Sequence, residues 1–113
     1  MVVTDARQIK FGVEYISKHS DSIVVAGRCC GDTILLEDRF AAVYDPDTPP
    51  SSSTFVEGIK VCLTVVSIEP FGDVFMTDWD SVDPGFSARI ELTGHGAEKV
   101  RPFCVLANDD QYP

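Results

Sequence analysis

The chain is short of positive charge. Its 113 residues include 9 Lys and Arg but 18 Asp and Glu, which gives a formal net charge of −9. Nucleic-acid-binding proteins draw much of their affinity from Lys and Arg side chains that neutralise phosphates. Here the few basic residues are scattered singly along the chain. The composition therefore argues against autonomous binding to RNA, DNA or an anionic membrane, and it is compatible with a basic protein partner.

Long apolar segments are also missing. No run approaches the roughly 20 apolar residues that a membrane helix requires. The N-terminal segment, MVVTDARQIKFG, has neither the basic start nor the apolar stretch of a secretory signal peptide. Hydrophobic residues make up 44% of the chain, close to the average of globular domains. These features predict a cytoplasmic protein that folds as a single domain, residues 1–113, with no membrane association.

The sequence has no C-x-x-C pair, although it contains four cysteines. Neighbours Cys29 and Cys30 point to opposite faces of a strand and cannot easily share one set of metal ligands. Cys62 and Cys104 each lie inside an apolar run. We therefore expect buried free thiols, no metal site and no cofactor, and a redox role for Cys29 and Cys30 stays open.

A helical period is absent from the apolar residues, which occur in short runs rich in Val and Ile between Gly, Asp and Pro. This pattern is typical of strands joined by turns. The sequence predicts strands over Phe11–Ile16, Ile23–Cys29, Thr33–Leu36, Arg39–Tyr44, Phe55–Glu69, Val74–Met76, Phe86–Thr93 and Val100–Ala107. The fold class is therefore all-β, a small closed antiparallel β-barrel with its core over about 11–107, a mobile loop at 45–54 and a polar tail at 108–113.

Two strands carry patterns that predict how they are buried. Phe55–Glu69 is apolar at both odd and even positions, which indicates a strand covered at least partly on both faces. The next long strand alternates, so Phe86, Ala88, Ile90 and Leu92 are expected on one buried face.

The acidic loop Thr77–Gly85 is the most distinctive local sequence. Its carboxylates Asp78, Asp80 and Asp83 offer oxygen ligands of the kind that Ca²⁺ prefers, but the full EF-hand pattern is missing. Trp79 either faces a partner, as interface aromatics often do, or closes the end of the barrel. We predict a partner-binding face made of Trp79, Asp78, Asp80, Asp83 and Phe86.

Catalytic signatures are scarce. The chain has two histidines, His19 and His95, and neither stands near a recognisable nucleophile elbow. A pair formed in space, for example Cys104 with His95, stays open as an alternative. We predict a protein without catalytic residues.

The order of the strands resembles domain 2 of elongation factor Tu and its relatives among the translational GTPases. That family has a strand of type V-V-x-G-R, a turn strand I-x-x-G-D/E-x-V, a strand V-x-x-I, a segment G-x-x-x-x-x-x-L-x-G and a last strand G-x-V-L-A. The matching segments here are Val24–Arg28, Ile34–Phe40, Val61–Ile68, Gly85–Gly94 and Val100–Ala107. The resemblance implies a translation-factor domain 2-like barrel over nearly the whole chain.

Three departures limit what the resemblance implies for function. The sequence has no G-x-x-x-x-G-K-S/T loop, so the GTP-binding domain is absent from it. Glu37 replaces the turn glycine, so that turn is expected to take another form. Phe86 and Ser87 stand where tRNA-carrying members place polar pocket residues. We therefore predict a stand-alone, non-catalytic protein-binding module, with a regulatory or an immunity role as its options. The alternative is an accessory factor that binds tRNA or the translation machinery.

Overall fold

The structure, a computed structural model, describes residues 8–44, 56–57, 59–70, 80–108 and 111–112. Its elements follow the order β1 (Lys10–Lys18), β2 (Ile23–Cys29), β3 (Ile34–Leu35), β4 (Arg39–Tyr44), β5 (Val56–Glu57), β6 (Ile59–Pro70), β7 (Ser81–Val82), β8 (Ser87–His95), the 3₁₀ turn η1 (Ala97–Lys99), β9 (Val105–Ala107) and β10 (Gln111–Tyr112). Within the described ranges, no helix is long and apolar enough to cross a membrane.

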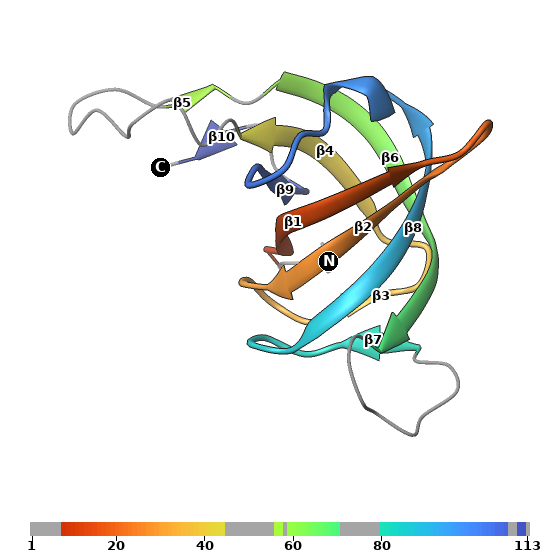
Figure 1. Cartoon of the computed structure of the whole chain (residues 1–113). Coiled ribbons are helices and arrows are strands. Elements are labelled where there is room, and N and C mark those ends of the chain that lie inside the picture. The colour runs from red at the N-terminus through yellow and green to blue at the C-terminus, as the bar shows by residue number, and fades with distance from the viewer. Residues whose placement is uncertain (1–7, 45–55, 58, 71–79, 109–110, 113) are drawn as a thin grey trace, which may run out of the picture.

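Six of the strands form a closed barrel in the order β1-β2-β8-β6-β4-β9, and β9 pairs back onto β1. All the pairings are antiparallel. Closure joins the two edge strands of the sheet, since β9 pairs with β1 at Lys10–Gly12. Two short ribbons, β3–β7 and β5–β10, complete the described structure (Figure 1). The prediction of a small closed antiparallel barrel is confirmed.

The barrel interior is filled by apolar side chains from all six strands and from β3. The largest of those that are fully buried are Phe11, Phe40, Ile34, Leu63, Ile90, Leu92 and Leu106. A small barrel of this kind has room inside for its own side chains. Any ligand must therefore bind on the outside of the barrel or at one of its ends.

A β-bulge in β6 explains the apolar pattern of the longest strand. Leu63, Val65 and Ile68 are buried, whereas Val66 is 46% exposed and interrupts the register with β8 between Val65 and Ser67. A bulge inserts one residue and so shifts the inward-facing positions from odd to even numbers. The prediction that this strand is covered on both faces is wrong. Its inward face simply changes parity at the bulge.

Close approach of β1 and β2 depends on Gly27. A Cβ built on Gly27 would lie 1.8 Å from the carbonyl oxygen of Gly12, a backbone atom that cannot rotate away. At Gly12 itself, the nearest atom to an added Cβ is 3.8 Å away, an ordinary contact. Of these two glycines, only Gly27 must lack a side chain. Gly27, which precedes Arg28 in the V-V-x-G-R segment, therefore has a packing role.

The predicted bounds of β2 and β4 are confirmed, while the last strand is shorter than predicted. The amide of Cys104 donates to the carbonyl of Arg101 at 3.2 Å, and Phe103 has a φ of +71°. Proline followed by a residue with positive φ is the signature of a type II turn. Residues 101–104 therefore reverse the chain, and β9 begins only at Val105.

Glu37 also takes a left-handed conformation, with a φ of +71°. Its amide donates to the carbonyl of Val65 at 2.9 Å, and the amide of Val65 donates to Asp38 at 2.8 Å. The expectation that glutamate forces this turn away from a conformation suited to glycine is therefore wrong. The two hydrogen bonds to β6 hold the turn in place, and the backbone of Glu37 bears the strain.

Three predicted segments fall wholly or partly outside the described residues: the strand Val74–Met76, the loop 45–54 and residues 109, 110 and 113 of the tail. The tail also contains a short strand that was not predicted, β10, which pairs with β5.

Candidate functional site

The β3–β7 ribbon covers one end of the barrel. Ile34 pairs with Val82 and Leu35 with Ser81. Ile34 and Val82 are 0% and 1% exposed and belong to the main core, whereas Leu35 is 41% exposed. Because side chains alternate along a strand, one face of the ribbon plugs the barrel and the other meets solvent. The sequence prediction placed Ser81 and Val82 in a loop and missed this short strand.

Hydrogen bonds hold an aspartate at each end of the ribbon, through the carboxylate of Asp83 at one end and through the backbone carbonyl of Asp80 at the other. The hydroxyl of Thr33 donates to Oδ1 of Asp83 at 3.0 Å. At the other end, the amide of Leu36 donates to the carbonyl of Asp80 at 3.3 Å. Both aspartates are exposed. The ribbon therefore carries negative charge at two positions that its own backbone pairing holds apart.

The turn Asp83-Pro84-Gly85-Phe86 places an aromatic side chain beside Asp83. The amide of Phe86 donates to the carbonyl of Asp83 at 3.1 Å, and Gly85 has a φ of +89°. Proline and then glycine at the centre of the turn give a type II geometry. Two further bonds anchor it to β2, because the amide of Gly85 donates to Cys29 at 2.7 Å and the amide of Cys29 donates to Phe86 at 3.0 Å.

This turn corrects the predicted orientation of Phe86. Ala88, Ile90 and Leu92 are fully buried, as the alternation predicts, but Phe86 is 56% exposed. Phe86 precedes β8 and belongs to the turn, so the alternation of the strand does not reach it. Its side chain is therefore more than half exposed on the outer surface.

We call the solvent-facing residues Leu35, Leu36, Asp80, Asp83 and Phe86 the β3–β7 surface. Three of the five residues predicted to bind a partner, namely Asp80, Asp83 and Phe86, lie exposed on or beside the β3–β7 ribbon. Two exposed leucines that sequence reasoning missed lie on the same ribbon and in its adjoining turn. The sequence feature that could have identified these leucines is the position of Leu35 and Leu36 directly before a tight turn. Asp78 and Trp79 lie outside the described residues.

A cation site in the acidic loop gains no support from its described part. Asp80 and Asp83 lie toward opposite ends of the ribbon, and an oxygen of Asp83 already accepts from Thr33. Ca²⁺ requires six to eight oxygen ligands gathered around one point. No group of three His, Cys, Asp or Glu side chains suited to a metal occurs in the described part of the chain.

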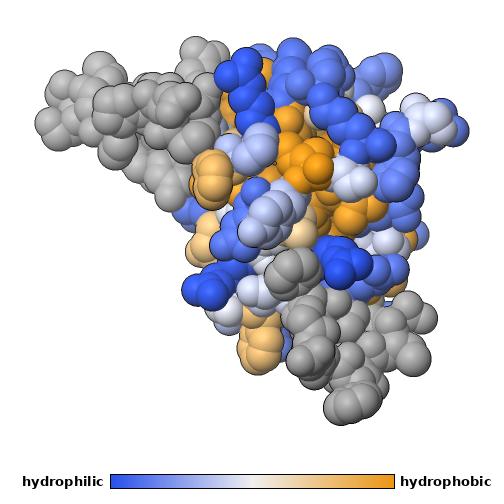
Figure 2. Space-filling view, viewed as in Figure 1, coloured by the Kyte–Doolittle hydropathy of each residue, from blue (hydrophilic) through white to orange (hydrophobic). Residues whose placement is uncertain are grey.

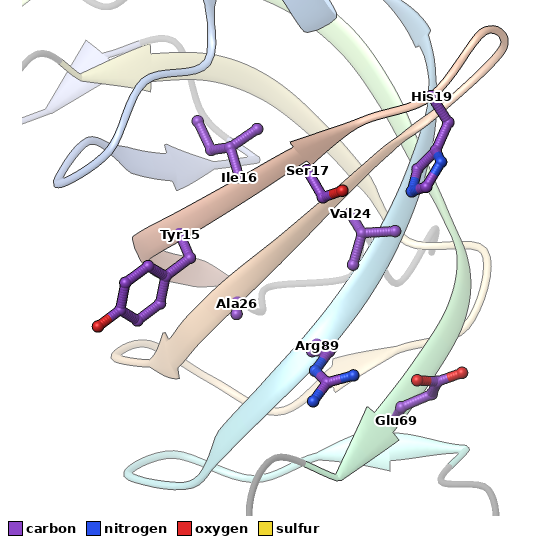
Figure 3. A pocket seen from close by; sticks show the side chains of 8 residues that line it. All are labelled: Tyr15, Ile16, Ser17, His19, Val24, Ala26, Glu69 and Arg89. Atoms are coloured by element: carbon purple, nitrogen blue, oxygen red, sulfur yellow. The ribbon is translucent and has the colours of Figure 1, made fainter.

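A shallow depression lies on the outer face of β1, β2 and β8, and Figure 3 shows the side chains that line it. Its volume is about 420 Å³. The cross-strand pairs Tyr15–Ala26, Ala26–Arg89 and Arg89–Glu69 form one row across the sheet. Tyr15 is 66% exposed because a bulge in β1 turns it outward. Figure 2 shows hydrophobic surface bordered by hydrophilic side chains on this side of the molecule.

A second depression, of about 380 Å³, is lined by residues of β6, of β8 and of the η1 turn. Here Cys62 stands directly opposite His95, and both side chains are exposed. The prediction that Cys62 is buried is wrong, because it lies at an outward position of β6. The Cys–His pair formed in space is Cys62 with His95, whereas Cys104 is 1% exposed in the core.

Burial disfavours ionisation of the thiols of Cys29 and Cys30, and the pKa of each is raised. All four cysteines are free, and Cys29 is fully buried while Cys30 is exposed, as their opposite orientation predicts. Desolvation raises the pKa of the Cys29 thiol above its ordinary 9.0, and the nearby Cys30 and Asp83 raise this pKa further. The Cys29 Sγ donates to the carbonyl of Asp32 at 3.2 Å. Desolvation also raises the pKa of Cys30, although Lys10 opposes it.

Comparison with known proteins bears on the fold. No protein-family model matches the sequence, and neither does any curated protein. Among solved structures, the chain is similar to the apo form of translation elongation factor SelB from Methanococcus maripaludis, with a TM-score of 0.65 and 15% identity. The match covers 96% of this chain and 20% of that one. The closed barrel and this likeness show that the chain resembles, in its fold, the domain 2 barrel of elongation factor Tu-like translational GTPases.

Proposed function

We propose that the chain is a non-catalytic protein-binding barrel whose β3–β7 surface docks a basic protein partner. The observation that carries the proposal is the exposure of Phe86, Leu35 and Leu36 at the end of the barrel that also holds Asp80 and Asp83. Exposed apolar side chains gathered with charges of one sign are typical of docking sites. A filled barrel interior leaves the outer surface for this role.

The charge of this end argues for a basic partner. Besides Asp80 and Asp83, the neighbouring turns contribute Asp32, Glu37 and Asp38, against Arg28 and Arg39 at the adjoining strand ends. The whole chain carries a formal charge of −9. Complementary charge raises the rate of encounter and suppresses wrong partners, and it makes binding sensitive to salt. Asp78 and Trp79 adjoin this end in sequence and complete the predicted face.

Phe86 is the residue expected to contribute most of the binding free energy. Aromatic anchors that become buried at the centre of an interface dominate affinity, and charges at the rim contribute less. The type II turn and its two bonds to Cys29 hold the backbone of Phe86 in position before binding. Preorganisation of this kind lowers the entropy lost on association.

The experiment places a photo-crosslinking phenylalanine analogue at position 86 of the full chain and exposes it to an extract of the source cells. A matched variant carries the analogue at position 103, where Phe103 is 70% exposed on a different turn. The proposal expects a basic protein that crosslinks from position 86 and not from position 103, with a yield that falls as salt rises. Equal crosslinking from both positions, or none from position 86, would contradict it.

The likeness to the elongation factor favours a second candidate, in which the barrel is an accessory factor that binds tRNA or the translation machinery. Co-sedimentation of the full chain with ribosomes, and binding of aminoacyl-tRNA at low salt, test this candidate. Binding to aminoacyl-tRNA would favour it over a basic protein partner. No binding to either at low salt would exclude it.

A further inference from the structure

The depression between β6 and β8 contains a thiol beside an imidazole. Cys62 and His95 are directly opposite each other in the antiparallel ladder. Residues in that relation point to the same face, with Cβ atoms about 4.5–5.5 Å apart. Both side chains are exposed and line one depression. The imidazole of His95 and the thiol of Cys62 are therefore neighbours on the same face of the sheet.

The surroundings of this pair are positively charged, in contrast to the rest of the chain. Lys60 lies two residues before Cys62 on β6 and Lys99 lies in the η1 turn, and both line the same depression. Glu98 is the one carboxylate among the lining residues described. Two ammonium groups against one carboxylate attract anionic molecules to this depression.

Two glycines hold the strands close at this point. An added Cβ on Gly94 would lie 1.9 Å from the carbonyl oxygen of Cys62, and one on Gly96 would lie 2.6 Å from Cγ1 of Val61. Both glycines have positive φ, +135° and +95°. The backbone of β8 therefore passes against β6 and turns sharply into η1, which brings Lys99 to the same depression as Cys62.

The other three cysteines lack this combination. Cys29 and Cys104 are buried. Cys30 is exposed, but burial of its sulfur raises its pKa and it lies on a different strand end, beside Lys10. Cys62 alone combines exposure with an imidazole and two ammonium groups in one depression.

We propose that Cys62 is a thiol–disulfide exchange site for small disulfides that carry carboxylate groups. The thiol proton passes to the imidazole of His95 or to water, and the Cys62 sulfur attacks one sulfur of the disulfide. The disulfide bond breaks and a mixed disulfide forms at Cys62. The other half leaves as a thiolate and takes up a proton. Cys62 is oxidised and the departing half is reduced, while Lys60 and Lys99 attract the carboxylates of the half that stays attached.

The test measures exchange rates of the full chain with three small disulfides of different charge. The probes are 5,5′-dithiobis(2-nitrobenzoate), which is anionic, 4,4′-dithiodipyridine, which is neutral, and cystamine, which is cationic. Peptide mapping by mass spectrometry identifies the labelled cysteine, and a Cys30→Ser variant removes the other exposed thiol. We expect the anionic probe to label Cys62 faster than Cys30. In Cys62→Ser, the fast phase of the reaction with this probe should disappear.

Charge variants separate attraction from simple exposure. Lys60→Gln and Lys99→Gln are each expected to slow the anionic probe about twofold or more, the effect of one unit charge a few ångström away in a watery medium. The same variants should leave the cationic probe unchanged or make it faster. Lys18→Gln, an exposed lysine of β1 outside this depression, serves as the matched control.

Two results would overturn the proposal. One is preferential labelling of Cys30 by the anionic probe. The other is an equal effect of Lys60→Gln on the labelling rates of the anionic and cationic probes. Such a result would show that Lys60 changes the access of probes to Cys62 and does not attract negative charge. Far-UV circular dichroism of each variant confirms that it is folded before rates are compared.

Discussion

Substitution of Gly27 by alanine tests how tightly β1 and β2 approach in the barrel wall. The new Cβ would lie 1.8 Å from the carbonyl oxygen of Gly12, whereas real Cβ atoms essentially never come within 3.0 Å of such a neighbour. The two backbones must therefore separate by at least the difference between 3.0 and 1.8 Å, which is 1.2 Å. This shift falls where Val13 pairs with Gly27, next to the bulge that already interrupts the ladder.

The expected loss is large for a single methyl group. Overpacking typically costs about 1–3 kcal/mol, and here both clashing groups are backbone, so we expect about 3 kcal/mol. A domain of this size has a stability of about 5–15 kcal/mol, so the variant remains folded at low temperature. The melting temperature should fall by about 12 °C, at about 4 °C for each kcal/mol. Thermal and urea unfolding followed by far-UV circular dichroism measure both quantities.

Gly12→Ala is the matched control, since it adds the same methyl group one strand away. Its nearest neighbour, the carbonyl oxygen of Arg28, is 3.8 Å from the new Cβ. Alanine also lowers the entropy of the unfolded chain, which stabilises by about 0.4–1 kcal/mol where the backbone conformation is compatible. We expect a melting temperature equal to or slightly above that of the wild type. If both alanine variants melt alike, the reasoning from close approach is refuted.

Three further predictions concern stability. Glu37→Gly should stabilise by about 0.5–1 kcal/mol in urea unfolding, because relief of left-handed strain exceeds the added entropy of glycine; a loss of stability would refute the strain. Val82→Ala should cost about 2 kcal/mol through the cavity left under the β3–β7 ribbon, whereas exposed Leu35→Ala should cost less than 1 kcal/mol, about the limit for surface positions. Because the pKa of Cys29 is raised in the folded state, its contribution to stability is complete below the ordinary value of 9.0 and is lost as pH rises through the folded value. The decline in melting temperature above pH 9.0 should therefore be shallower in Cys29→Ala, and identical pH profiles would contradict the burial of that thiol.

Much of the barrel could be predicted because local signals and the fold agree. The runs Ile23–Cys29 and Arg39–Tyr44 are short, mostly apolar stretches between turn residues, so their bounds follow from the sequence. The bulge at Val66 could not be foreseen, because a residue inserted in one strand depends on its pairing with another. When the bulge is not known, apolar residues at both odd and even positions of one strand suggest that both faces of the strand are covered.

The candidate sites show the same division between local and long-range information. The exposed carboxylates Asp80 and Asp83 follow from a polar, proline-containing loop. The exposure of Phe86 does not follow, because it depends on a type II turn bonded to Cys29 on another strand. The Cys62–His95 pair joins positions far apart in the sequence through the register of β6 with β8, which no local pattern specifies.

The central claim is that the β3–β7 surface binds a basic protein through Phe86. The most direct measurement is the dissociation constant of the crosslinked partner for the wild type, Phe86→Ala and Phe103→Ala, taken by calorimetry at two salt concentrations. We expect Phe86→Ala to weaken binding at least about tenfold, or about 1.4 kcal/mol. Phe103→Ala should bind like the wild type. Higher salt should weaken the binding of the wild type and of Phe103→Ala alike. Unchanged affinity in Phe86→Ala, or a loss confined to Phe103→Ala, would contradict the claim.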